Sequence, residues 1–203
     1  MLGQRKYSAG SISRGDTDLD ASKLLSQHLQ KLSLACRAVP ALDLACGAGR
    51  NGLYLLANDI PVVFADRDSD SLEKIRQQLA TQFHSGQRDR AQLWEVDLEI
   101  PGSHPLEARA FGAITVFRYL HRPLLEGIKN AVVPGGLVIY ETFTLAQAEI
   151  GRPRNPDFLL RPGELRGCFS QWEILHDFEG IERDSSSGQP RAIAQVVAQK
   201  PLT

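Results

Sequence analysis

The sequence predicts a three-layer α/β fold, in which helices cover both faces of a mostly parallel sheet. Short apolar runs alternate with segments of helical periodicity, which is the pattern of βαβ units. The apolar runs are continuous, as in strands that are buried on both faces. The last two apolar segments have no helix between them, and this predicts an antiparallel hairpin at the end of the sheet.

The first half of the chain contains the clearest alternation. Leucines at helical spacing predict a helix over residues 18–34, with Asp16, Thr17 or Asp18 as its N-cap. Strands and helices then alternate, at residues 41–45, 50–57, 61–66, 72–83 and 91–97. Ser69 or Asp70 would cap the helix over residues 72–83, whose apolar residues share one face.

The second half completes a seven-stranded sheet. Its predicted elements are a strand at 112–117, a helix at 121–132 ended by Pro134 to Gly136, and a strand at 136–142. A polar loop at 144–158 and a short helix at 161–169 follow. Strands at 171–178 and 191–199, joined by a flexible loop at 184–188, form the antiparallel hairpin.

Composition limits the classes of function. The chain has 203 residues, 42% of them hydrophobic, which suits one soluble domain over residues 18–203 after a loose polar segment at 1–17. Lys and Arg number 23 and Asp and Glu 24, a balance that disfavours a nucleic-acid surface. The three cysteines are widely spaced and no apolar run could span a membrane. We therefore expect a cytoplasmic protein without a metal site; its oligomeric state is not readable.

The stretch over residues 39–52 combines a strand, a glycine turn and a helix start. Gly47, Gly49 and Gly52 match G-x-G-x-x-G, so a nicotinamide or flavin site must be considered. Asp43, however, would lie beside the dinucleotide's pyrophosphate and repel it. S-adenosylmethionine has no phosphate and carries an ammonium and a sulfonium, which an acid attracts. The residues favour S-adenosylmethionine, with an NAD-type oxidoreductase as the alternative.

Several stretches resemble the motifs of one enzyme family. Residues 42–49, Leu-Asp-Leu-Ala-Cys-Gly-Ala-Gly, resemble motif I of class I S-adenosylmethionine-dependent methyltransferases. Residues 63–66, 96–98 and 111–114 resemble the second, third and fourth motifs, and 133–136 the turn before strand five. The predicted hairpin matches that family's Rossmann-like, seven-stranded sheet. Within the family, the chain most resembles the small bacterial methyltransferases related to tellurite resistance.

The resemblance implies an enzyme and assigns roles to its residues. Asp43 would face the methionine moiety, Asp66 would hold the ribose, and Asp97 with the residue after it would bind adenine. The whole set expected to bind the cofactor is Asp43, Ala45, Gly47, Gly49, Asp66, Arg67, Asp97, Leu98 and Phe117. Gly112 departs from the family, which usually has an acid there. This departure keeps open a non-catalytic, S-adenosylmethionine-binding adaptor.

The end of the fourth strand is the first candidate for the acceptor site, because open α/β sheets bind ligands beyond the carboxyl ends of their strands. Arg118, Tyr119, His121 and Arg122 follow one another there. In one interpretation the segment has no functional role: Tyr119 packs in the protein interior, His121 caps the next helix and the two arginines are exposed to solvent. Alternatively the segment recognises an anion, with Arg118, Tyr119 and His121 as catalytic residues and Tyr119 or His121 as a possible base.

The loop after strand five is the second candidate, since long loops at this edge are often functional. Arg152, Arg154, Asn155 and Arg161 could bind a carboxylate, a phosphate or another oxyanion together with Arg118, Tyr119 and Arg122. The alternative is an ordinary proline-stiffened surface loop. We expect both clusters to face one cleft and the acceptor to be a small molecule. It would be anionic, or a soft nucleophile such as a thiol or a chalcogen oxyanion, which needs little help from a base.

Overall fold

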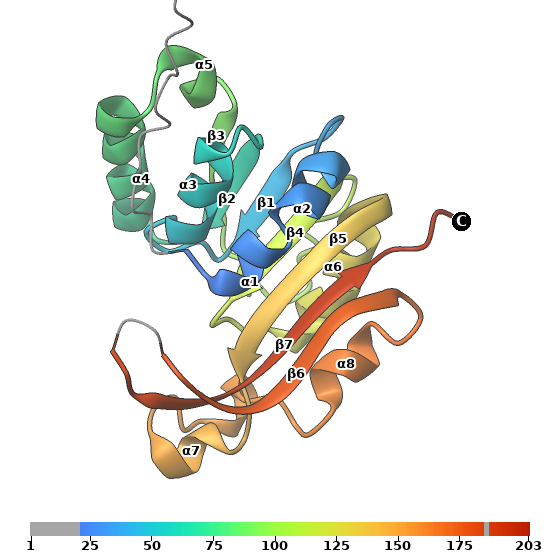
Figure 1. Cartoon of the computed structure of the whole chain (residues 1–203). Coiled ribbons are helices and arrows are strands. Elements are labelled where there is room, and N and C mark those ends of the chain that lie inside the picture. The colour runs from blue at the N-terminus through green and yellow to red at the C-terminus, as the bar shows by residue number, and fades with distance from the viewer. Residues whose placement is uncertain (1–20, 185–186) are drawn as a thin grey trace, which may run out of the picture.

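A computed structural model describes residues 21–184 and 187–203 of the chain. The predictions for residues 1–17 and for a helix cap at residues 16–18 lie outside this part. Within it, a seven-stranded sheet runs in the order β3-β2-β1-β4-β5-β7-β6, with helices on both faces (Figure 1). This confirms the predicted α/β class and the antiparallel hairpin at the end of the sheet.

The strands are β1 (Ala41–Leu44), β2 (Val62–Asp66), β3 (Ala91–Glu95), β4 (Phe111–Phe117), β5 (Val132–Phe143), β6 (Glu173–Arg183) and β7 (Pro190–Gln199). The helices are α1 (Lys23–Gln27), α2 (Leu29–Ala35), α3 (Arg50–Ala57), α4 (Ser69–Gln82), α5 (Ser85–Arg88), α6 (Leu125–Ala131), α7 (Gln147–Ile150) and α8 (Glu164–Cys168). Two 3₁₀ turns complete the set, η1 (Arg122–Leu124) and η2 (Pro156–Phe158).

The pairing of the strands creates a switch point at the middle of the sheet. β1 to β5 are parallel, and β7 pairs antiparallel with both β5 and β6. β1 lies between β2 and β4, so the chain moves outward from β1 in one direction and then restarts on its other side. Ligands of open α/β sheets bind at the carboxyl ends of the strands that flank such a reversal, here β1 and β4.

The core has one hydrophobic layer on each face of the sheet. Leu42 and Leu44 of β1 belong to the layer formed with α6 and α8, while Ala41 belongs to the layer formed with α1 to α4. All four residues of β1 are buried. Because side chains alternate across a strand, burial on both faces explains why the strands appear in the sequence as continuous apolar runs.

Some element boundaries differ from the sequence prediction. The first helix is broken at His28 into α1 and α2, and the side chain of Ser22 caps α1 by accepting a hydrogen bond from the Leu24 N–H. The short helix α7 lies within the loop predicted at 144–158, and α5 lies between the helix predicted at 72–83 and the strand predicted at 91–97. β6 runs on to Arg183, because its pairing with β7 continues as far as Pro190. Because the hairpin is longer than predicted, it extends past the carboxyl end of β5.

Gly112 lies near the start of β4, at the amino edge of the sheet. Its N–H donates to the carbonyl of Pro40, and the last turn of α2 packs directly on it. A Cβ atom at this position would lie 2.2 Å from the backbone oxygen of Ala35. Glycine is needed here for close packing. The departure from the family motif therefore lies at the edge opposite the carboxyl ends of the strands, where ligands of such sheets bind.

We predict that Gly112→Ala destabilises the protein by about 3 kcal/mol, because the contact is with backbone, which cannot move aside as a flexible side chain could. Urea unfolding followed by circular dichroism measures the change. Gly167→Ala in α8 is the matched control, since a Cβ there meets nothing within 4 Å, and its stability should equal or slightly exceed that of the wild type. Equal stability of Gly112→Ala and wild type would contradict the prediction.

Candidate active site

The chain turns sharply between β1 and α3. Ala45, Gly47 and Gly49 have positive φ, at 52°, 52° and 76°, a conformation that favours glycine. A Cβ atom added to Gly49 would lie 2.7 Å from Ile75 of α4, whereas one added to Gly47 would meet nothing within 4 Å. The turn thus packs against α4 on one side and leaves open space above Gly47 on the other.

Two carboxylates hold this turn from neighbouring strands. Asp43 of β1 accepts hydrogen bonds from the Gly52 N–H at 2.8 Å and from the Thr115 hydroxyl at 3.1 Å. Asp66, at the end of β2, accepts a hydrogen bond from the Gly47 N–H at 2.7 Å. The conformation of the turn therefore depends on side chains from β1, β2 and β4.

The Asp43 carboxyl group points toward protein groups beneath the turn, whereas the sequence prediction had it face a ligand. The residue is 3% exposed, and both carboxyl oxygens bind protein groups beneath the turn. Burial raises the pKa of Asp43 to about 7, against the opposing effects of the hydrogen bonds from Gly52 and Thr115 and the charge of Arg50. The carboxyl group is therefore only partly ionised at neutral pH. The sequence predicts a charged carboxylate that faces the methionine moiety, whereas in the structure both oxygens of Asp43 accept hydrogen bonds from the protein.

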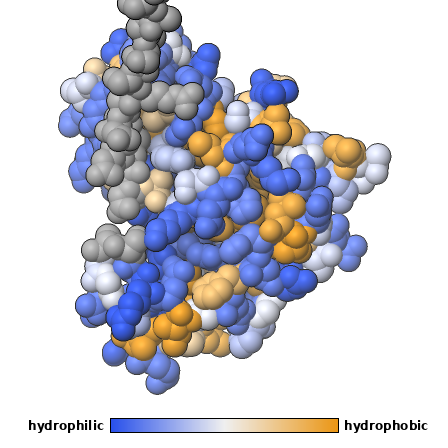
Figure 2. Space-filling view, viewed as in Figure 1, coloured by the Kyte–Doolittle hydropathy of each residue, from blue (hydrophilic) through white to orange (hydrophobic). Residues whose placement is uncertain are grey.

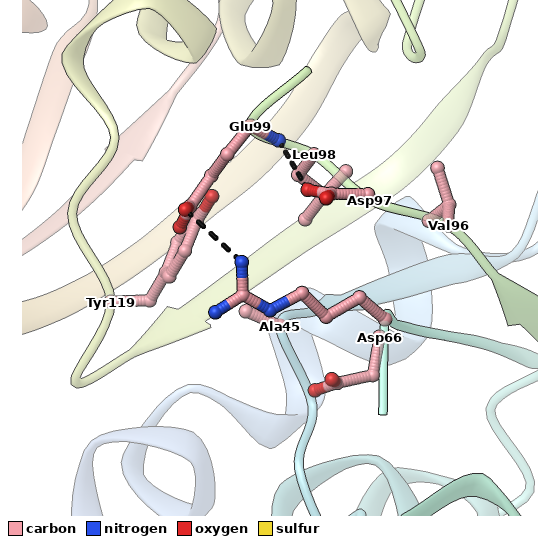
Figure 3. A pocket seen from close by; sticks show the side chains of 8 residues that line it. Ala45, Asp66, Val96, Asp97, Leu98, Glu99 and Tyr119 are labelled. Atoms are coloured by element: carbon pink, nitrogen blue, oxygen red, sulfur yellow. Dashed lines mark hydrogen bonds and ion pairs between the residues drawn. The ribbon is translucent and has the colours of Figure 1, made fainter. Parts of the chain in front are cut away.

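A pocket of about 200 Å³ opens at the carboxyl ends of β1, β2 and β3. It is lined by Ala45, Asp66, Arg67, Val96, Asp97, Leu98, Glu99 and Tyr119 (Figure 3). Residues that are far apart in the sequence but were predicted to share one ligand thus come together in one cavity. Of the other predicted cofactor residues, Asp43, Gly47 and Gly49 belong to the adjoining turn. Phe117 packs against the core layer of α1 to α4 instead.

An ion pair lies at this pocket. Arg67 directly follows the last residue of β2, and its Nη1 lies 3.3 Å from Glu99 Oε2. The N–H of Glu99 donates to the Asp97 carboxylate at 2.9 Å. Glu99 was not among the predicted residues, although it lies only two positions after Asp97. Its carboxylate therefore links the segments that follow β2 and β3.

Tyr119 places a phenol in the same pocket. Its hydroxyl is buried and has no hydrogen-bond partner at normal geometry within the described residues. Burial, and next the charge of the nearby Glu99, raise the pKa of Tyr119 above its usual value. The phenol therefore stays protonated at neutral pH. Tyr119 can donate a hydrogen bond to a ligand, and the raised pKa makes it a weaker candidate for a general base.

Arg118 lies at the end of β4 with a strained backbone. Its φ is 58°, and its N–H donates to the Glu141 carbonyl at 2.8 Å. Its Nη2 donates to Asp184 of the β6–β7 hairpin at 2.8 Å. Non-glycine residues with positive φ are uncommon and cluster at functional sites. Arg118 and Ala45 have this conformation at the ends of β4 and β1, and so flank the switch point of the sheet.

Arg122 has a structural role in place of the predicted anion-binding one. Its Nε and Nη2 donate to the two carboxylate oxygens of Glu164 at 2.6 and 2.9 Å. Its Nη1 and Nη2 also donate to the carbonyls of Asp157 and Leu159 at 2.9 and 2.8 Å. The hydrogen bonds to Glu164 raise the pKa of Arg122 and lower that of Glu164. Arg122 thus ties the end of β4 to the loop after β5.

The remaining predicted acceptor residues lie on the outer part of this loop. The side chains of Arg152, Arg154, Asn155 and Arg161 are exposed. The Asn155 side chain caps η2 by accepting a hydrogen bond from the Asp157 N–H at 3.0 Å. Arg154 Nε donates to the Gly151 carbonyl. His121 is half-buried at the start of η1, and its side chain makes no capping hydrogen bond.

Sequence reasoning missed residues that act through distant contacts. Thr115 orients Asp43, Glu141 accepts from Arg191 at 3.0 Å, and Asp184 binds Arg118. The period-two pattern of β4 places Thr115 on the face of the sheet opposite Ile114 and could have suggested its orientation. Nothing in the sequence indicates that the loop containing Asp184 reaches Arg118, since 66 residues separate them.

The described ranges contain no group of three or more side chains that could hold a metal ion. Among their helices, none has the length and apolar character needed to cross a membrane. The face of the molecule in Figure 2 is mostly hydrophilic, with separate hydrophobic patches.

Comparison with solved structures identifies similar folds. The structure of TehB from Haemophilus influenzae matches with a TM-score of 0.63 and 19% identity, covering 84% of this chain and 61% of that one. The N-methyltransferase NodS from Bradyrhizobium japonicum WM9 matches with a TM-score of 0.62 and 13% identity, over 92% and 98% of the two chains. The glycopeptide N-methyltransferase MtfA, in complex with S-adenosylmethionine, matches with a TM-score of 0.58 and 17% identity, over 87% of each chain.

Comparison of sequences gives the family. No curated protein sequence matches significantly. The family model described as tellurite resistance protein TehB matches residues 25–185, which is most of the chain. Together with the fold, this match confirms the resemblance to class I S-adenosylmethionine-dependent methyltransferases related to tellurite resistance. The chain belongs to the TehB family.

Proposed function

We propose that this protein transfers the methyl group of S-adenosylmethionine to a small acceptor, a soft nucleophile that is a thiol or an anionic chalcogen compound. The observation that carries the proposal is the pocket at the carboxyl edge of the sheet. There Ala45, Asp66, Arg67, Asp97 and Leu98, the residues that match the family's cofactor motifs, line one cavity. The TehB family match and the methyltransferase fold support the same cofactor.

In this proposal the adenine, the ribose and the methionine portion of the cofactor lie in that order along the pocket. Asp97 and Leu98 would receive the adenine and Asp66 the ribose hydroxyls. The open space above Gly47 would receive the methionine portion. Asp66 Oδ1 already accepts from the Asp68 N–H and Oδ2 from the Gly47 N–H. The carboxylate is therefore oriented before a ligand arrives, which reduces the entropic cost of binding.

Methyl transfer from a sulfonium is an in-line displacement, so positioning supplies most of the rate enhancement. A base is required only if the acceptor arrives protonated. A phenol is already protonated at neutral pH, and burial raises the pKa of Tyr119 further, so we expect an acceptor that is itself nucleophilic at neutral pH. Arg118, at the end of β4, supplies a positive charge for an anionic acceptor. The description of the family as tellurite-resistance proteins supports a chalcogen oxyanion.

The alternatives have less support. An NAD-type oxidoreductase is not supported by the family match, which is to TehB, or by the solved structures described above, which are TehB and two methyltransferases. A non-catalytic adaptor was suggested by Gly112. That residue lies at the amino edge of the sheet, and packing against Ala35 accounts for it.

The direct test is an acceptor screen. We expect release of S-adenosylhomocysteine when the protein is incubated with S-adenosylmethionine and one of a set of thiols, selenite or tellurite. Carboxylates and amines serve as hard-nucleophile controls. The acceptor assignment fails if only the hard nucleophiles give product. The activity assignment fails if S-adenosylmethionine does not bind by calorimetry.

Asp66→Asn should weaken the binding of S-adenosylmethionine by about 10- to 100-fold, because hydrogen bonds to a charged acceptor contribute about 1.5–3 kcal/mol each. Calorimetric titration measures the dissociation constant. Asp59→Asn is the control. Asp59 pairs with Arg90 after α3, away from the pocket, and asparagine tolerates its positive φ of 63°. Equal affinity of the Asp66 variant and wild type would remove this residue from the cofactor site.

Asp43 should make the stability of the protein depend on pH. Its pKa is about 7 in the folded state against 3.8 as a reference, so between these values the folded state keeps a proton that the unfolded state releases. The free energy of unfolding therefore decreases as pH rises through this range, and the decrease is complete above the folded pKa. Its size is roughly 4 kcal/mol at most.

Asp43→Asn should abolish this component, because asparagine keeps an oxygen for the Gly52 N–H but does not titrate. Urea unfolding of the wild type and the variant at about pH 5 and about pH 8 gives the change in the free energy of unfolding for each protein. The difference between the two changes is the contribution of Asp43. A variant that loses as much stability as the wild type over this range would show that Asp43 does not titrate there.

A further inference from the structure

The β6–β7 hairpin brings a carboxylate to the proposed acceptor site. Asp184, directly after β6, accepts a hydrogen bond from Arg118 Nη2 at 2.8 Å. The hairpin extends past the carboxyl end of β5 (Figure 1). Arg118 therefore meets a carboxylate of its own chain at the end of β4, where the fold binds ligands and where an anionic acceptor would approach.

Asp184 is held in place independently of Arg118. Its Oδ1 accepts hydrogen bonds from the N–H and the hydroxyl of Ser187 at 3.0 and 3.1 Å. Its Oδ2 lies 3.6 Å from Arg191 Nη1, and that guanidinium also pairs with the buried Glu141 at 3.0 Å. Asp184 would thus keep a cation and two hydrogen bonds if Arg118 turned to another anion, so an exchange of partners costs little.

Arg118 is the arginine at this strand end that can make the exchange. Its side chain is 48% exposed, against 13% for Asp184. Its backbone is fixed by the hydrogen bond from its N–H to the Glu141 carbonyl, while the long side chain can turn. Arg122 cannot do the same, because its guanidinium donates to Glu164 and to two backbone carbonyls of the loop after β5.

We propose that Asp184 is a specificity-determining residue that competes with the acceptor for Arg118. In the ligand-free protein Asp184 neutralises Arg118, and an oxyanion binds by replacing it. Neutral and weakly hydrogen-bonding compounds cannot displace the carboxylate, so Asp184 selects acceptors that offer a localised negative charge. This inference rests on the proposed function, since it concerns the acceptor half of the same site.

Calorimetric titration of inorganic selenite into the protein saturated with S-adenosylhomocysteine, at constant ionic strength, tests the competition. Asp184→Asn keeps an oxygen for Ser187 but removes the charge opposite Arg118. We expect it to bind selenite about two- to fivefold more tightly than the wild type, the effect of releasing a partly exposed ion pair. Arg118→Gln should bind selenite more weakly, and adding Asp184→Asn to it should give no gain.

Asp177→Asn is the matched control. Asp177 lies on the same hairpin and pairs with Arg166 at 2.8 Å, so this variant should bind selenite as the wild type does. Circular dichroism verifies that each variant is folded.

Binding of S-adenosylmethionine is measured in parallel on every variant. If the cofactor binds but Asp184→Asn gains no affinity for selenite, or Arg118→Gln loses none, the competition is refuted and the methyltransferase proposal stands. If the wild type does not bind the cofactor, the proposed function itself fails.

Discussion

The site depends on the hydrogen bonds by which two carboxylates, those of Asp43 and Asp66, fix the glycine turn and the start of α3. Asp43 and Asp66 come from adjacent strands. Asp66 accepts a hydrogen bond from the Gly47 N–H in the turn, and Asp43 accepts one from the Gly52 N–H at the start of α3. Because β1 pairs with β2 and with β4, the register of three strands sets the positions of both acids and of Thr115. A shift of one residue would turn these side chains to the opposite face. The hydrophobic layers that fix the register thereby also fix the shape of the pocket floor.

The two halves of the site are built in different ways. On the cofactor side, each residue lies at or just after the end of a strand, so local sequence and strand order place it. On the acceptor side, Arg118 meets Asp184 from the hairpin, and Arg122 meets Glu164 across the loop after β5. These pairs join segments that are distant in the sequence. The acceptor side therefore depends on how the last third of the chain folds back over β4 and β5.

This difference explains what could be predicted from the sequence. The fold and the glycine turn followed from periodicity and spacing, and the proposal of Asp66, Asp97 and Leu98 as cofactor residues followed from their resemblance to the family's motifs; all of these are local properties of the sequence. The orientation of Asp43 did not, because one of its hydrogen-bond partners is Thr115 of β4, 72 residues away. The contacts of Arg122 could not be predicted for a similar reason: an arginine beside a strand end looks the same in sequence whether a ligand or Glu164 neutralises it. Only the fold reveals which partner is nearer.

Ala45 shows what the site demands of its backbone. Its φ of 52° is one that a side chain makes unfavourable by roughly 1–2 kcal/mol, and glycine would relieve the strain. The alanine nevertheless lines the pocket, so the strained residue lies at the proposed cofactor site. Strain of this kind clusters at functional sites, so under the proposed function Ala45 gives up stability for the shape of the cofactor pocket. The sequence best suited to folding and the sequence best suited to that function would then differ here by one methyl group.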